Sequence, residues 1–140
     1  MSDAALEHSD IQGIVRGYAK PWNHARHVYL RIHDQAHGRA FLEWLDAPTS
    51  IQGYYEDESP RLMNLGFSFT GLTMLGLDVD ALDSFPAEFR RGMAARAHIN
   101  GDEGASAPEH WEPYWHGRGI DLWVGLYASN VCVLDEYEEE

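Results

Sequence analysis

The sequence predicts an α+β domain in which four antiparallel strands and two helices follow one another in the order βαββαβ, with the helices on one face of the sheet. Three segments alternate apolar and polar side chains with the two-residue period of a half-buried strand. Two further segments repeat apolar residues at helical spacing, and 140 residues fit a single core. This order of elements is that of a ferredoxin-like domain.

The first strand is predicted at 27–33, where every second residue from Val28 to Ile32 is apolar. Asp34 can cap the helix that follows, because a carboxylate accepts hydrogen bonds from the free amides of a helix start. Apolar residues then recur at helical spacing until Pro48 ends the pattern. These segments form the first strand and the first helix of the predicted order.

The remaining elements follow from composition and from period. β-Branched and aromatic residues at 49–55 predict the second strand, and apolar alternation at 62–69 predicts the third. Helical turns are predicted at 70–76 and 86–100, each closed by glycine. Strict alternation at 120–127 predicts the fourth strand.

The chain is predicted to be one domain over residues 1–140, ordered from about residue 9 to residue 128. Five of its last six residues, 135–140, are acidic. A run of like charges at a terminus is typical of a solvated, frayed tail. An acidic docking peptide is the alternative interpretation.

Bulk composition excludes several classes of partner. Ten Lys and Arg against 23 Asp and Glu give a net charge of -13, which repels nucleic acid and anionic membrane surfaces. The first ten residues contain neither a basic nor an apolar stretch, so no secretion signal or membrane span is expected there. A single cysteine, Cys132, excludes an internal disulfide and favours a reducing, cytoplasmic location.

The outward face of the predicted sheet carries large side chains. Alternation places Tyr29 and Arg31 of the first strand, and Trp123 and Tyr127 of the last, on this face. Side chains of this size are rare on a sheet surface that faces only water. We therefore expect the sheet to pack on another surface, with these four residues as interface candidates.

Residues for catalysis or metal binding are not found in a converging pattern. Eight histidines are present, but His27 and His33, on one side of the first strand, are expected about 20 Å apart, too far to share an ion. No nucleophile motif and no glycine-rich phosphate loop is present. The sequence therefore predicts no metal site and no catalytic residue.

A string of motifs runs from Asn64 to Trp111. It contains Asn-Leu-Gly-Phe-Ser-Phe-Thr-Gly-Leu, then Phe-Pro-Ala-Glu-Phe-Arg-Arg-Gly-Met-Ala-Ala-Arg-Ala, then Ser-Ala-Pro-Glu-His-Trp, and Asp-Ile-Gln-Gly begins earlier, at Asp10. These motifs resemble the amino-terminal half of DyP-type (dye-decolourising) haem peroxidases, and the resemblance extends from Asp10 to about Ala128. It implies one ferredoxin-like half of a two-half enzyme whose haem lies in the other half.

The resemblance transfers no catalytic residue to this chain. The family's Gly-x-x-Asp-Gly motif has no counterpart in the 140 residues. Its proximal histidine and distal arginine are expected in a half that would follow Glu140. The isolated chain is therefore expected to be inactive and to bind no haem by itself, with His27 and His33 as the only weak candidates for an axial ligand.

Three functions stay open at this point. In the first, the chain is the non-catalytic half of a DyP-type peroxidase, active only when a second half or subunit completes it. Alternatively, it is a standalone binding module, two copies of which pair sheet to sheet as a homodimer without haem. The third possibility is a dimer that binds haem through His27 or His33.

Overall fold

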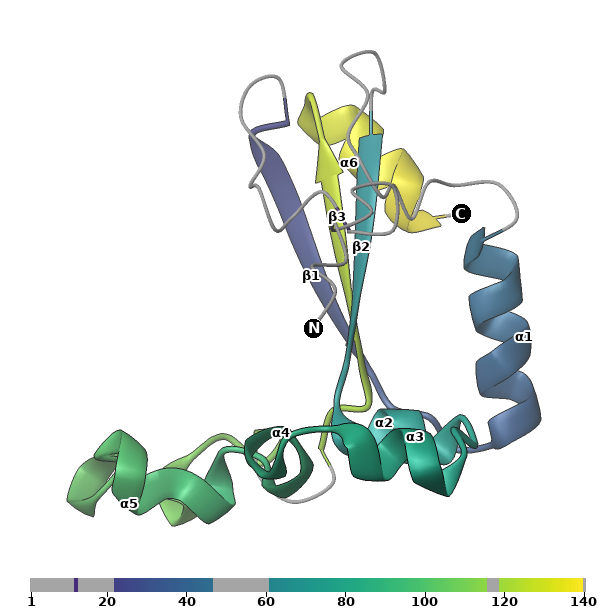
Figure 1. The fold of residues 1–140 in the computed structure, drawn as a ribbon. Helices are drawn as coiled ribbons and strands as arrows, with labels where there is room; N and C mark the ends of the chain where they lie inside the picture. The colour runs from purple at the N-terminus through teal and green to yellow at the C-terminus, as the bar shows by residue number, and fades with distance from the viewer. Residues whose placement is uncertain (1–11, 13–21, 47–60, 116–118, 140) are drawn as a thin grey trace, which may run out of the picture. The chain divides into compact units, whose positions relative to one another are not determined.

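In a computed structural model of the chain, residues 12, 22–46, 61–115 and 119–139 are described (Figure 1). The fold is α+β, with an antiparallel sheet whose described strands are β1 (His24–Leu30), β2 (Arg61–Phe67) and β3 (Leu122–Ala128). β3 lies between the other two, so the strand order is β1-β3-β2. The α+β class is confirmed. The predicted strand at 49–55 lies outside the described residues, so a fourth strand and the ferredoxin-like order stay predictions.

β1 and β3 have the predicted periodicity, but the alternation predicted at 62–69 is wrong: β2 buries four consecutive residues, 62–65, and ends at Phe67, because Phe69 already begins α2. In β3, Leu122, Val124 and Leu126 are buried, as the alternation predicts. β1 ends three residues before the predicted end, because the N–H of Ile32 turns to the side chain of Asp121, 2.9 Å away, and leaves the strand ladder. Polar contacts at the sheet end therefore set the strand boundaries.

Six α-helices are described, together with short 3-10 turns at Ala94–Arg96, Gly104–Ser106 and Pro108–His110. Asp34 caps the first of them as predicted, since its carboxylate accepts the N–H of His37 at 3.0 Å. This backbone hydrogen bond, followed by the contact with the His37 ring, lowers the pKa of Asp34. The helices are α1 (Gln35–Asp46), α2 (Phe69–Met74), α3 (Val79–Ser84), α4 (Ala87–Arg91), α5 (Ala97–Asn100) and α6 (Val131–Glu139).

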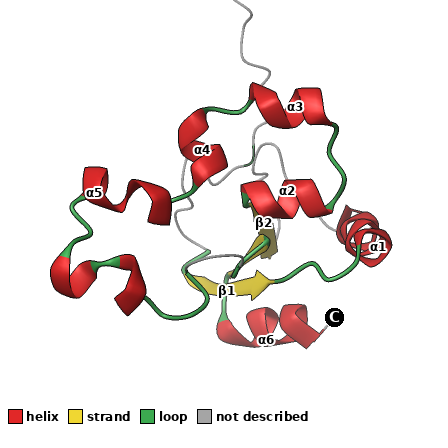
Figure 2. Cartoon of the chain, turned by 90° about the horizontal axis from the view of Figure 1, so that it is seen from below, coloured by secondary structure: helices red, strands yellow, loops and turns green. Residues whose placement is uncertain are grey.

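The single helix predicted at 86–100 is wrong. The segment contains α4, a 3-10 turn and α5 as separate pieces (Figure 2). The break falls at Gly92, whose φ of 71° cannot continue a right-handed helix. The predicted end of the preceding helical turn is confirmed, because Gly76 has a φ of 75° and its N–H bonds back to Thr73.

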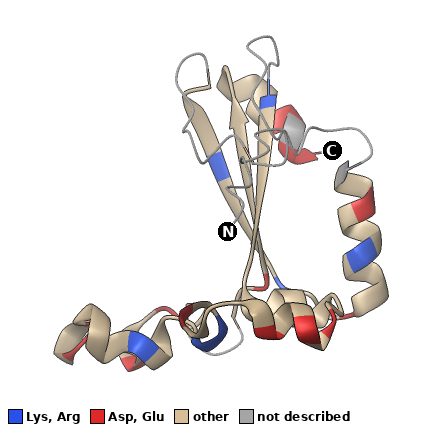
Figure 3. Ribbon diagram, in the orientation of Figure 1, with Lys and Arg blue, Asp and Glu red and all other residues tan. Residues whose placement is uncertain are grey.

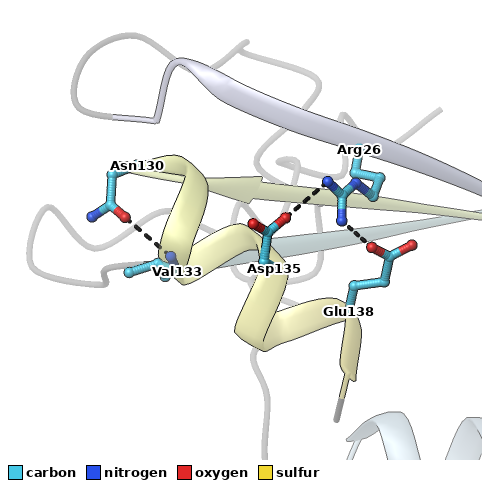
Figure 4. A network of polar contacts seen from close by, with 5 residues as sticks. All are labelled: Arg26, Asn130, Val133, Asp135 and Glu138. Carbon is cyan, nitrogen blue, oxygen red and sulfur yellow. Dashed lines mark hydrogen bonds and ion pairs between the residues drawn. The ribbon is translucent and has the colours of Figure 1, made fainter.

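The acidic run predicted to be a frayed tail lies in α6 as far as Glu139. The side chain of Asn130 accepts the N–H of Val133 at 3.0 Å and so caps the helix. Arg26 of β1 contacts Asp135 at 3.0 Å and also contacts Glu138 (Figure 4). Figure 3 shows acidic residues along α6. Asp135, Glu136, Glu138 and Glu139 are exposed, while Leu134 is buried. The contacts with Arg26 and the burial of Leu134 therefore stabilise the position of α6.

The chain divides into two compact units. The first unit contains residues 1–28, 42–65 and 124–140, and the second contains 29–41 and 66–123. Each of the three strands passes from one unit into the other. The first unit buries Trp22, Leu45, Leu62, Met63, Leu65, Val124, Leu126, Ala128 and Leu134, and the second buries Ile32, Leu75, Ala107 and Leu122.

Candidate functional site

A buried polar junction lies at the sheet end of the second unit. Asp121, directly before β3, has no exposed surface. Its carboxylate accepts the N–H of Ile32 at 2.9 Å and the hydroxyl of Thr70 at 3.1 Å. Its own N–H donates to the carbonyl of Leu30 at 2.9 Å, and its carbonyl accepts the N–H of Ser68 at 3.1 Å. One residue therefore fixes the end of β1 and the start of α2 to the start of β3.

The motif residues that follow β2 build this junction. Ser68 is the N-cap of α2, and its side chain accepts the N–H of Gly71 at 3.0 Å. Gly71 is buried, and a methyl group on its Cα would overlap the carbonyl oxygen of Asp121. The Ser-Phe-Thr-Gly part of the motif string is thus structural: it supplies a cap, a hydroxyl donor and a residue small enough for close approach.

The start of α1 is attached to the end of α2 by two side chains. Gln35 donates to the carbonyl of Leu75 at 3.1 Å, and Arg39 donates to the same carbonyl at 2.7 Å. Arg39 also donates to the carbonyl of Gly76 at 3.2 Å. These carbonyls carry the partial negative charge of a helix C-terminus, which favours a cationic donor. The sequence gives no signal for this role, because the acceptors are backbone atoms far along the chain.

Gln12, from the Asp-Ile-Gln-Gly motif, pairs with the backbone of β2 in the first unit. Its amide nitrogen donates to the carbonyl of Leu65 at 2.9 Å, and its amide oxygen accepts the N–H of Leu65 at 2.7 Å. β2 stands at an edge of the described sheet, where backbone groups need partners. Gln12 therefore acts as a one-residue substitute for a neighbouring strand.

Replacing Gln12 with alanine is expected to lower the free energy of unfolding by about 1–2 kcal/mol, because both Leu65 groups lose their partner. Gln12→Glu keeps an acceptor for the N–H of Leu65 but sets a carboxylate oxygen against its carbonyl, so a loss at least as large is expected. Urea unfolding followed by circular dichroism measures both. Wild-type stability in Gln12→Ala would show that this pairing is not formed in solution.

The predicted interface residues of the second unit are Tyr29, Arg31 and Trp123. Tyr29 of β1 is 48% exposed and meets the ring of Trp115 edge to face, with centroids 5.2 Å apart. Arg31 is exposed and lies one residue beyond the end of β1. Trp123 of β3 is half-buried, with its ring against Gly66 of β2. Gly66 has no side chain, which leaves room for this indole.

The predicted interface residue of the first unit is Tyr127 of β3, which is half-buried. Its ring meets that of His27 edge to face, with centroids 6.1 Å apart. Burial raises the pKa of the Tyr127 hydroxyl, because the phenolate is poorly solvated there. The four candidates are thus divided between the units, three in the second and one in the first.

The two histidines considered as haem ligands do not lie in a haem pocket among the described residues. His27 and His33 are exposed and belong to different units. His33 lines a cavity of about 340 Å³, near the lower end of the roughly 300–1,000 Å³ of small-ligand pockets, which is too small for a macrocycle. In the part of the chain described, no three His, Cys, Asp or Glu side chains gather as metal ligands. The cavity at His33 is therefore not a haem pocket.

No family model and no curated protein matches the sequence. Solved structures match its fold. A decolorizing peroxidase (DyP) from Auricularia auricula-judae matches with a TM-score of 0.72 and 22% identity. A second DyP structure matches with a TM-score of 0.70 and 18% identity, and a dye-decolorizing peroxidase engineered in its heme pocket for asymmetric sulfoxidation with 0.69 and 21%.

Each match covers 96% of this chain and 29% of the peroxidase chain. The resemblance to DyP-type peroxidases that the motifs indicate is therefore confirmed at the level of the fold. The chain spans less than a third of the length of the enzymes that it matches. None of the described helices has the length and apolar content that crossing a bilayer requires.

Proposed function

We propose that this chain is the amino-terminal, non-catalytic part of a DyP-type haem peroxidase, active only together with a second half or subunit. The observation that carries the proposal is the extent of the fold match, 96% of this chain against 29% of the peroxidase. A further part of the fold would then hold the haem. We also propose that 49–55 adds a fourth strand, which would complete the ferredoxin-like βαββαβ order.

Haem, bound in that second part, would supply the peroxide-dependent oxidation. The residues of this chain contribute a framework. The Asp121 junction holds the sheet end in the second unit, and Gln12 satisfies the edge of β2 in the first. Within each unit, a framework held by such hydrogen bonds can present a surface to the haem-binding part without large rearrangement on association.

We propose that the second part packs on the sheet surface of the second unit that presents Tyr29 and Trp123, with Arg31 at its edge, and that Tyr127 is the interface residue of the first unit. Tyr29 supports this most directly, since nearly half of its surface is exposed and Trp115 beside it is 54% exposed. Tyrosine and tryptophan are enriched at protein interfaces, because each can bury a large apolar area there and still offers a polar O–H or N–H group.

Analytical ultracentrifugation of this chain mixed with a polypeptide carrying the Gly-x-x-Asp-Gly half of a DyP-type peroxidase tests the proposed surface. A one-to-one complex is expected, and Tyr29→Asp is expected to weaken it at least about tenfold, because a carboxylate replaces a buried ring. Val79→Asp, at an α3 residue that is 71% exposed, serves as the control and should leave association unchanged.

Two outcomes would contradict the proposal. The first is the absence of any complex when both polypeptides are folded. The second is a stable homodimer of this chain alone that excludes the added half, which would instead support the standalone binding module.

A further inference from the structure

The second unit contains a cavity to which the proposed function assigns no ligand. Its volume is about 340 Å³, and its apolar lining comes from Leu30, Ile32, Phe41 and Leu122. Pockets of about 300–1,000 Å³ that combine apolar walls with a few polar groups are typical sites for small molecules. The apolar walls favour a ligand with a hydrocarbon body, because water inside the cavity can form few hydrogen bonds with such walls.

The walls are fixed by the buried junction. The N–H of Ile32 bonds to Asp121, and the carbonyl of Leu30 accepts the N–H of the same residue. Across the cavity, α1 approaches so closely that a methyl group at Gly38 would lie 2.9 Å from a methyl carbon of Ile32. The cavity is therefore bounded by elements that hydrogen bonds and tight packing hold in place.

The polar part of the lining contains Arg31, His33, Asp34 and His37. Asp34 already accepts the N–H of His37 at 3.0 Å and lies 2.8 Å from the ring nitrogen Nδ1 of the same residue. Arg31 forms no hydrogen bond or ion pair with the residues that the structure describes. Arg31, which is exposed, is thus the one arginine of the lining, and it has no partner among the described residues that would keep it from a ligand.

A guanidinium presents a planar fork of N–H donors that matches a carboxylate in two parallel hydrogen bonds. A protein with a net charge of -13 repels anions in general, so an anion would need a specific cationic contact to bind. The lining also contains one carboxylate, that of Asp34, but this group is already engaged by the N–H and the ring of His37, whereas Arg31 repels a cation. The lining therefore selects for an anion that has an apolar body.

We propose that this cavity binds a small apolar carboxylate, with its hydrocarbon body against Leu30, Ile32, Phe41 and Leu122 and its carboxylate paired with Arg31. The site needs neither haem nor a second polypeptide. The inference thus goes beyond the proposed function. Arg31, at the edge of the proposed docking surface, is the one residue that both proposals use, and the tests stay separate because the titration needs this chain alone.

Titration of the 140-residue chain with benzoate, followed by amide NMR shifts, tests the site. Saturable shifts are expected at Arg31, Ile32, Phe41 and Leu122. Benzamide, which has the same shape without the charge, is expected to bind about tenfold more weakly or worse, since a charge-assisted pair is lost. Arg31→Gln should weaken benzoate by a similar factor and leave benzamide unchanged.

Arg91→Gln is the matched control, because it removes an exposed arginine from α4, whose residues do not line the cavity. It should bind benzoate as the wild type does. Equal affinity for benzoate and benzamide, equal loss of benzoate binding in Arg91→Gln, or no saturable shifts at the cavity residues would each overturn the proposal. The amide spectrum of Arg31→Gln, outside the cavity, shows that the variant is folded.

Discussion

Gly71→Ala is expected to destabilise the protein by about 3 kcal/mol or more, the upper range for overpacking a core. The added methyl group would overlap the carbonyl oxygen of Asp121, which is a backbone atom. That oxygen cannot move freely, because it accepts the N–H of Ser68 and belongs to the residue that leads into β3. Alanine would gain about 1 kcal/mol in helix propensity, which is too little to offset the overlap.

Urea unfolding monitored by circular dichroism measures the effect of Gly71→Ala. Thr73→Ala is a control in the same helix, since Thr73 is exposed and its hydroxyl only donates back to the carbonyl of Phe69. Its unfolding free energy should change by no more than about 0.5 kcal/mol, as for most surface substitutions. Equal stability of Gly71→Ala and the wild type would show that α2 does not approach Asp121 as the structure has it.

Asp121→Ala is expected to lower the free energy of unfolding by about 2–3 kcal/mol. The substitution removes the acceptor that Asp121 offers to the N–H of Ile32 and one of two partners of the Thr70 hydroxyl, which also lies 2.9 Å from Ser68 Oγ. A buried donor that loses its partner costs roughly 1–3 kcal/mol, and more when the partner is charged. The loss should appear as a lower urea midpoint with an unchanged slope.

Thr70→Val separates the two hydrogen bonds of this carboxylate. It removes only the hydroxyl, at 3.1 Å, and should cost about 1 kcal/mol. In the double variant with Asp121→Ala the two losses should not add, because both substitutions remove the same contact. Fully additive losses would contradict a direct bond between Thr70 and Asp121.

Much of the fold follows from local patterns. Alternation in the last predicted strand identified the buried positions Leu122 and Val124, and Asp34 caps α1 as its position suggests. The strand ends could not be read in the same way. They depend on Asp121, whose partner Ile32 is 89 residues away in the sequence. The sequence alone does not show whether an acidic residue before a strand is exposed or buried.

α6 shows the limit of reasoning from charge alone. Its acids suggest a solvated tail, and they are indeed exposed. The helix is held by Leu134 and by Arg26, which lies 109 residues before Asp135. Asn130 was a visible signal for its start, because asparagine is a preferred N-cap residue.

The candidate site was predictable only in part. The motif string correctly indicated the fold of DyP-type peroxidases, but it could not reveal that Ser68, Thr70 and Gly71 serve the Asp121 junction. Gln12 and Arg39 bind backbone carbonyls, which carry no sequence signature. Contacts of this kind become visible only when the chain is folded.

Haem uptake by the two polypeptides together tests the proposed function most directly. The Gly-x-x-Asp-Gly half of a DyP-type peroxidase would be purified with hemin, with and without this chain, and the Soret band and peroxide-dependent dye oxidation recorded. The proposal predicts a Soret band shifted from free hemin, and dye oxidation, only when both are present. Hemin binding and activity of this chain alone, or a second half that is fully active without it, would contradict the proposal.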